Sequence, residues 1–86
     1  MLVRLPAGAN DARSREIATL RRQLQAQPRQ PDLALRLAQA HLARLAADGD
    51  PRDAGLAQAA LAPWWTDPAP PAGIRVARAV LRQFGH

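Results

Sequence analysis

The stretch that decides the fold is residues 32–63, DLALRLAQAHLARLAADGDPRDAGLAQAALAP. Pro31 and Asp32 form a helix start signal, and a helix is predicted over residues 32–47. Its apolar side chains occupy more than one stripe, at Leu33, Leu35, Leu37, Ala38, Leu42 and Leu45. Because a helix with one buried face needs only a single stripe, this helix is expected to pack against neighbours on two sides.

This helix is followed by the clearest turn in the chain, Asp48-Gly49-Asp50-Pro51. Gly49 can adopt the left-handed conformation that closes a helix, Asp50 can cap the next helix, and Pro51 suits a first helical turn. A second helix is therefore predicted over residues 51–62. Its inner face would carry Leu56, Ala57, Ala60 and Leu61.

A further helix is predicted upstream of this pair, over residues 11–26. Asn10 or Asp11 can cap its N-terminus. Pro28 cannot continue it. Residues 1–9 are predicted to be disordered or extended. The apolar stripe of the helix is Ile17, Leu20 and Leu24.

Residues 63–73 are too rich in proline for a helix or a central strand. A fourth helix is predicted over residues 72–84. Its apolar positions are Ile74, Ala77, Val80, Leu81 and Phe84. No segment alternates with a period of two, so we predict an all-α fold of two antiparallel helical hairpins, with residues 10–86 as one helical domain.

Composition limits the functions that this chain can have. It has 86 residues, no cysteine and a formal net charge of +5, and all of its basic residues are arginine. There is no apolar run of about 18 residues, as a transmembrane helix requires. The start of the chain is too quickly interrupted for a secretory signal, so the cytoplasm is the default expectation. The charge keeps open binding to nucleic acid or an anionic surface, although a basic pI says little about specific function.

Catalysis and metal binding find few candidates in the sequence. Ser14 is the only serine and has no base beside it. His41 has no second ligand at i+3 or i+4, so it is expected to be a packed helix residue rather than a metal ligand. The three aspartates Asp48, Asp50 and Asp53 are interpreted as turn and cap residues. We therefore expect no enzyme, no cofactor and no metal site.

Two groups of residues are candidates for binding a partner. Trp64 and Trp65 can contact a partner, since tryptophan is frequent in binding hot spots, or they can seal the corner before the last helix, which we favour. Arg75, Arg78 and Arg82 lie about one helical turn apart. They can form a ridge that binds phosphate or carboxylate groups, or simply a solvated helix face, and we favour the latter.

Residues 35–44, LRLAQAHLAR, resemble the first helix of a tetratricopeptide repeat. Leu37 and Ala38 match its large-small pair, and His41 stands where an aromatic residue is usual. The turn at residues 48–51 matches as well, and Ala54 or Ala57 matches the small residue that opens the second helix. Residues 74–84 then resemble the first helix of the next repeat, with Val76 and Ala77 as its large-small pair.

The resemblance covers about residues 20–86, and the stretch GDPRDAG with its later Trp-Trp pair is similar to bacterial tetratricopeptide-like proteins in which further repeats follow. The chain departs from the pattern in its longer turn and in Pro63-Trp64-Trp65, which replaces a single proline. The resemblance implies a non-enzymatic scaffold with a protein or peptide partner. It also implies a fragment whose last helix, with Ile74, Val80, Leu81 and Phe84, lacks its neighbour and can self-associate.

Overall fold

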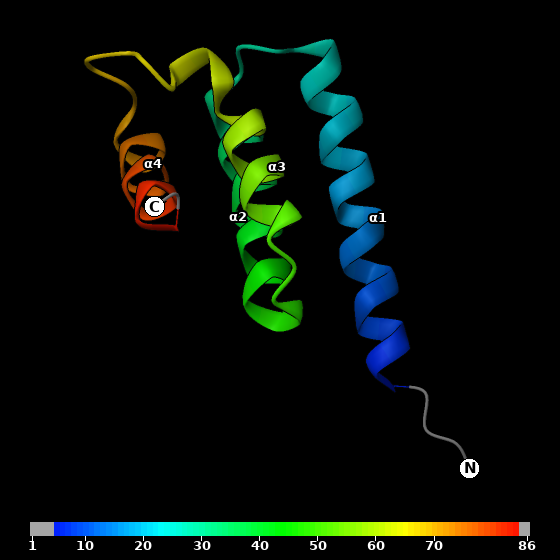
Figure 1. Cartoon of the computed structure of the whole chain (residues 1–86). Helices are drawn as coiled ribbons and strands as arrows, with labels where there is room; N and C mark the ends of the chain where they lie inside the picture. The colour runs from blue at the N-terminus through cyan, green and yellow to red at the C-terminus, as the bar shows by residue number, and fades with distance from the viewer. Residues whose placement is uncertain (1–4, 85–86) are drawn as a thin grey trace.

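A computed structural model describes the backbone of residues 5–84 and the side chains of residues 12–83. Every regular element in that range is helical, which confirms the all-α class. Figure 1 shows how the helices are arranged. The elements are α1 (Leu5–Ala26), α2 (Pro31–Asp48), α3 (Arg52–Ala60), the short 3-10 helix η1 (Ala62–Trp64) and α4 (Ala72–Phe84).

The first helix begins earlier than its predicted start near Asp11. Since α1 begins at Leu5, the described part of segment 1–9 is helical rather than extended, and residues 1–4 lie outside the described range. Pro6 falls in the first turn, where a missing backbone N–H breaks no helical hydrogen bond. Asn10 and Asp11 therefore lie within the helix instead of capping it.

The turn between α2 and α3 has the predicted geometry. Gly49 has a φ of 70°, and its backbone N–H donates to the carbonyl of Leu45 at 2.7 Å. Only glycine adopts this left-handed conformation without a steric cost from Cβ. The backbone N–H of Arg52 donates to Asp50 Oδ1 at 3.0 Å, so Asp50 supports the first turn of α3 as expected.

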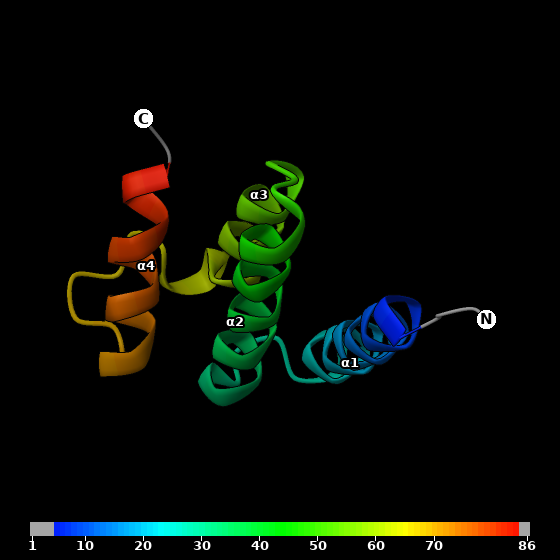
Figure 2. The ribbon, with the colours of Figure 1, turned by 90° about the horizontal axis from the view of Figure 1, so that it is seen from below.

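The centre of the fold is α2, which packs against α1, α3 and α4. Figures 1 and 2 show the α2–α3 pair in the middle, with α1 on one side and α4 on the other, steeply inclined to α1. Ala34, Ala38 and Ala57 are fully buried, and their small side chains let neighbouring helices approach closely. The prediction that the helix over residues 32–47 packs on two sides is therefore confirmed.

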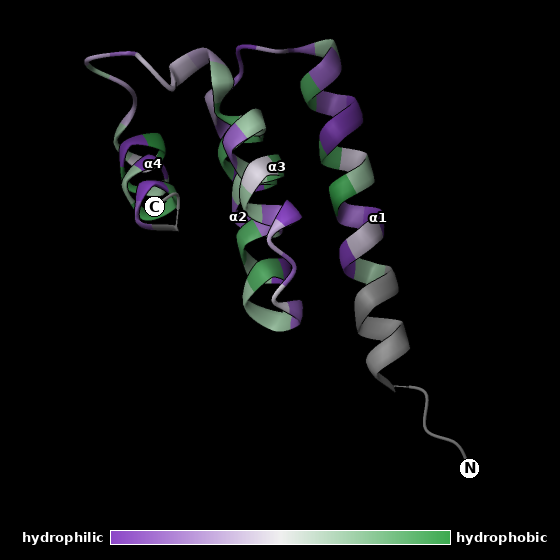
Figure 3. Cartoon of the chain, in the orientation of Figure 1, coloured by the Kyte–Doolittle hydropathy of each residue, from purple (hydrophilic) through white to green (hydrophobic). Residues whose placement is uncertain are grey.

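The outer helices contribute one buried stripe each. On α1 this stripe includes Ile17 and Leu20, and Figure 3 shows hydrophobic and hydrophilic residues alternating along the helix. On α4, Ile74 is 1% exposed and Leu81 is 4% exposed. The expectation that these two α4 side chains lack a partner is thus wrong, because they pack into the core that α4 forms with α2 and α3.

Other apolar side chains of α4 do face outward. Val76 is 64% exposed and Val80 is 37% exposed, whereas the side chain of Phe84 lies outside the described residues. Self-association through this face stays a prediction. No helix in the described part of the chain is both long and apolar enough to cross a membrane.

Candidate interaction site

The two tryptophans occupy different environments at the corner after α3. Trp64, the last residue of η1, is only 8% exposed and belongs to the hydrophobic core. Trp65 is half-buried, and the guanidinium carbon of Arg82 lies 5.4 Å from the centre of its ring. This is a cation–π distance, so the exposed part of Trp65 is already in contact with an α4 side chain. Trp64 therefore seals the corner, and only Trp65 is within reach of a partner.

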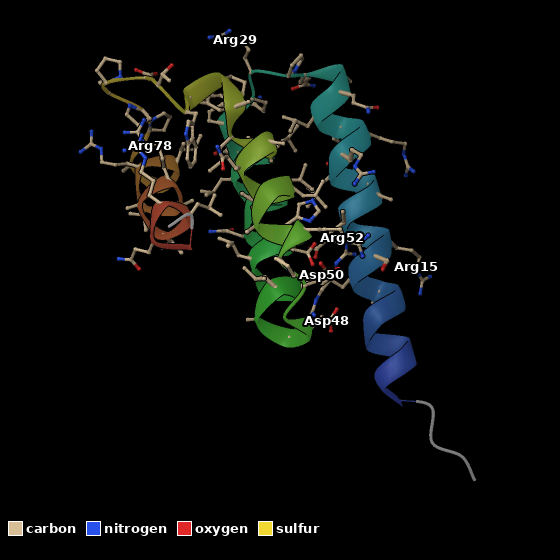
Figure 4. All side chains as sticks on the ribbon, in the orientation of Figure 1. Arg15, Arg29, Asp48, Asp50, Arg52 and Arg78 are labelled. Carbon is tan, nitrogen blue, oxygen red and sulfur yellow. The ribbon has the colours of Figure 1, made fainter. Side chains whose placement is uncertain are left out.

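The three arginines of α4 do not act as one ridge. Arg78 Nη1 donates to the backbone carbonyls of Trp64 at 3.0 Å, Trp65 at 3.2 Å and Asp67 at 2.8 Å. In Figure 4, Arg78 lies next to the connecting loop. These bonds hold the loop against α4, so the Arg78 guanidinium already binds backbone carbonyls of the chain itself.

The other two arginines differ from Arg78 in their surroundings. Arg82 Nη2 donates to the carbonyl of Trp65 at 3.4 Å, which is a longer bond than those of Arg78. Arg75 is exposed, and its side chain makes no hydrogen bond or ion pair with any described residue. The regular spacing of the three positions is thus real, but their side chains serve different roles.

A buried polar cluster joins α2 to α3 and was not predicted. His41 Nδ1 lies 3.2 Å from Asp53 Oδ1, and Arg44 Nε donates to Asp53 Oδ1 at 3.2 Å and to Oδ2 at 3.4 Å. His41 and Asp53 are each 2% exposed. His41 is therefore a packed helix residue as expected, whereas the interpretation of Asp53 as a turn or cap residue is wrong.

The sequence does carry a signal for this pair. His41 follows Ala34, Leu37 and Ala38 at helical spacing, so it lies on the buried stripe of α2. Asp53 precedes Ala57 and Ala60 in the same way on α3. Two polar residues on facing apolar stripes, on either side of one tight turn, are expected to pair because burial without a partner is costly.

Burial sets the charge state of His41. It is the largest cause of the lowering of the pKa of His41 from its ordinary value of 6.5, whereas the hydrogen bond and the charge of Asp53 raise that pKa. The charges of Arg44 and Arg21 lower the pKa further. A neutral imidazole has one donor and one acceptor nitrogen, and the carboxylate accepts from Nδ1. The other ring nitrogen, Nε2, is therefore an acceptor.

A second ion pair stiffens the turn at the surface. Arg52 Nη2 lies 2.8 Å from Asp50 Oδ2, and Figure 4 shows the two residues side by side. The side-chain hydrogen bond from Arg52 lowers the pKa of Asp50, and the same bond raises the pKa of Arg52. The two arginines near this turn, Arg44 on α2 and Arg52 on α3, thus each have a carboxylate partner.

Between α1 and α3, over α2, lies an open hollow of about 350 Å³, which we call the α1–α3 groove. Its apolar lining is Leu24, Leu37, Leu56, Ala59 and Ala60. Its polar lining is Arg21, Gln25 and His41. The sequence placed Leu56 on an inner face, but it is 39% exposed and forms a wall of this groove.

A smaller hollow of about 300 Å³ lies on the outer side of α3, where Gly55, Ala59 and Ala62 form the floor beside Trp65. Its lining has no charged side chain. Among the described residues there is also no group of three or more His, Cys, Asp or Glu side chains placed to hold a metal ion. The α1–α3 groove is thus the hollow that combines apolar walls with a buried polar group.

The arrangement of the four helices was compared with known proteins. The comparisons found no family model that matches the chain, no curated protein with a similar sequence and no matching solved structure.

Proposed function

We propose that this chain is a non-enzymatic protein-interaction scaffold of the tetratricopeptide type. One observation carries the proposal: α4 packs against both helices of the α2–α3 hairpin. In stacked helical repeats, each unit contacts its neighbour in this way, and the continuous core forms only between units. On this reading α2 and α3 are one repeat, and α4 is the first helix of the next.

The position of α1 fits the same scheme. It packs along α2 on the side away from α4, as the second helix of a preceding unit would. The fully buried Ala38 and the buried Leu37 occupy the large-small pair of the resemblance, and His41 is buried where an aromatic is usual. A stack of this kind offers an extended surface to a peptide, which is the use that such repeats make of it.

The alternative, binding to nucleic acid or an anionic surface, has less support. Arg78 is bonded to three backbone carbonyls, and Arg82 lies over Trp65. Arg44 and Arg52 are paired with carboxylates. A phosphate-binding ridge would need such guanidinium groups to face solvent together.

Peptide selection tests the proposal. The full chain is used to select peptides from a random library, and their affinities are measured by calorimetry at about 50 mM and about 500 mM salt. We expect peptides with apolar anchors whose affinity changes little with salt. A single-stranded oligonucleotide serves as the comparison probe. If the oligonucleotide binds more tightly than every peptide and its affinity falls steeply with salt, or if no selected peptide binds, the scaffold proposal is wrong.

A further inference from the structure

The α1–α3 groove is lined by a polar side chain, His41, with one ring nitrogen that no described residue uses. We propose that this groove receives a tryptophan or tyrosine side chain from an acidic peptide segment, with His41 Nε2 accepting the hydrogen bond of its N–H or O–H group. The inference rests on the proposed scaffold function and names the chemistry of the partner.

The unused polar atom is Nε2 of His41. His41 is 2% exposed, lines the groove and makes its one hydrogen bond through Nδ1. Among the described residues, no fully buried side-chain nitrogen or oxygen lacks a hydrogen-bond partner. Nε2 has no hydrogen-bond partner among the described residues, and the hollow that the His41 ring lines is the α1–α3 groove.

Nε2 can accept one hydrogen bond from a ligand. Asp53 holds the Nδ1 side of the ring, so Nε2 presents a lone pair in a fixed direction. A ligand that fills the groove must therefore bring one hydrogen-bond donor. A side chain without a donor, such as leucine or phenylalanine, would remove Nε2 from water and leave it unpaired, which weakens binding by about tenfold.

The size and polarity of the groove limit which side chain can fill it. The groove measures about 350 Å³, and leucine and alanine side chains form its walls. This is near the lower end of pockets that hold small ligands, about 300–1,000 Å³, so one large side chain fits but a helix does not. Indole and phenol combine a large apolar ring with a single donor at its edge. They match the groove in both respects.

The lining of the groove carries a positive charge. Arg21 lines the groove and is exposed, and its side chain makes no ion pair or hydrogen bond with any described residue. Arg22 follows it on α1, and the chain as a whole carries a net charge of +5. A carboxylate next to the aromatic residue of the partner can pair with Arg21, whereas a cationic partner would be repelled. This complementarity favours an acidic segment.

The test is a titration of the full chain with a defined peptide. The probe is a blocked pentapeptide with tryptophan at its centre and glutamate at the other positions. The matched probe carries 1-methyltryptophan, which has the same ring but no donor. Nitrogen NMR of the imidazole follows His41 directly. We expect the tryptophan peptide to shift the Nε2 resonance of His41, and the methylated peptide to bind about tenfold more weakly.

Two surface variants locate the binding. Arg21→Gln removes the charge that lines the groove, and we expect it to weaken the tryptophan peptide by about threefold to fivefold at low salt. Arg22→Gln, its neighbour on α1, lies outside the groove lining and serves as the matched control, with an unchanged affinity. Both positions are exposed, so neither change is expected to unfold the chain.

The outcomes separate this inference from the scaffold proposal. Equal affinity for the methylated peptide, or a bound peptide that leaves the His41 resonances unmoved, overturns the groove assignment. If library-selected peptides bind elsewhere while His41 is unaffected, the groove inference fails and the scaffold proposal stands. If neither the defined nor any selected peptide binds, both fail.

Discussion

Replacing Arg78 by methionine should loosen the corner between α3 and α4. The guanidinium group donates from Nη1 to the carbonyls of Trp64, Trp65 and Asp67. Methionine keeps an unbranched apolar stem but is shorter than arginine and has no donor. All three carbonyls would then have to find water or remain unpaired.

The size of the effect follows from the geometry. A hydrogen bond to a charged group contributes about 1.5–3 kcal/mol to stability. The three bonds leave from one nitrogen with only two hydrogens, so they amount to about two full bonds. Arg78 is only half-buried, and the loop carbonyls can partly turn to water, which reduces the loss. We expect a decrease of about 2 kcal/mol in the free energy of unfolding, or about 8–16 °C in the melting temperature.

The measurement combines circular dichroism and tryptophan fluorescence during denaturation in urea. Because Trp64 and Trp65 are the only tryptophans, fluorescence reports on this corner alone. Arg75→Met is the matched control, since Arg75 lies on the same helix, is exposed and has a side chain with no hydrogen bond or ion pair to any described residue. It should change stability by less than about 0.5 kcal/mol.

Equal losses in the two variants would refute this reasoning. They would mean that Arg78, like Arg75, contributes only to a solvated face of α4. A large loss in Arg78→Met with an unchanged fluorescence transition would also contradict it, because the effect would then lie away from the tryptophans.

Three further expectations concern stability. Because burial lowers the pKa of His41 in the folded state, the unfolded state takes up a proton first as the pH falls. The free energy of unfolding therefore decreases as the pH drops below about 6.5 and keeps its full value above it. Denaturation in urea between about pH 7.5 and pH 5 should show this loss, and His41→Gln, which keeps a donor for Asp53 but cannot titrate, should show less of it. Trp64→Ala should cost about 3–5 kcal/mol by urea denaturation, whereas the half-buried Trp65→Ala should cost far less, and equal costs would contradict the assignment of Trp64 as the buried ring. Gly49→Ala should destabilise the chain by about 1–2 kcal/mol because of its positive φ, while Gly55→Ala, inside α3 with open space around it, should raise the melting temperature slightly.

The positions of the helices were largely predictable because their ends depend on local chemistry. Gly49 ends α2 because it takes the left-handed conformation. The predicted third helix, over residues 51–62, is shorter than expected: α3 ends at Ala60, and Pro63 lies within η1, where a missing backbone N–H in a first turn breaks no helical hydrogen bond. The start of α1 was not predictable in the same way. Asn10 and Asp11 are good caps, but they also tolerate a helix interior, so they indicate an N-terminus without requiring one.

The roles of the polar side chains were harder to predict than the helices. Helical periodicity places Arg75, Arg78 and Arg82 near one side of α4, but it does not say what lies opposite them. The three carbonyls that face Arg78 come from a loop whose path depends on how Trp64 packs. In the same way, the pairing of His41 with Asp53 depends on the register of α2 against α3, which is a tertiary property.

The central position of α2 has a consequence for how the molecule opens. Since α1 packs mainly on α2 and is held there by Ile17, Leu20 and Leu24, it can detach while α2, α3 and α4 keep their shared core. Local opening of this kind has its own free energy, below that of global unfolding. Amide hydrogen exchange should therefore be fastest in α1, and proteases should first cut near the exposed residues 27–30. Detachment would also hydrate His41, so acid should lower the protection factors of the α1 amides, which are corrected for the intrinsic slowing of exchange in acid, before it lowers those of α2.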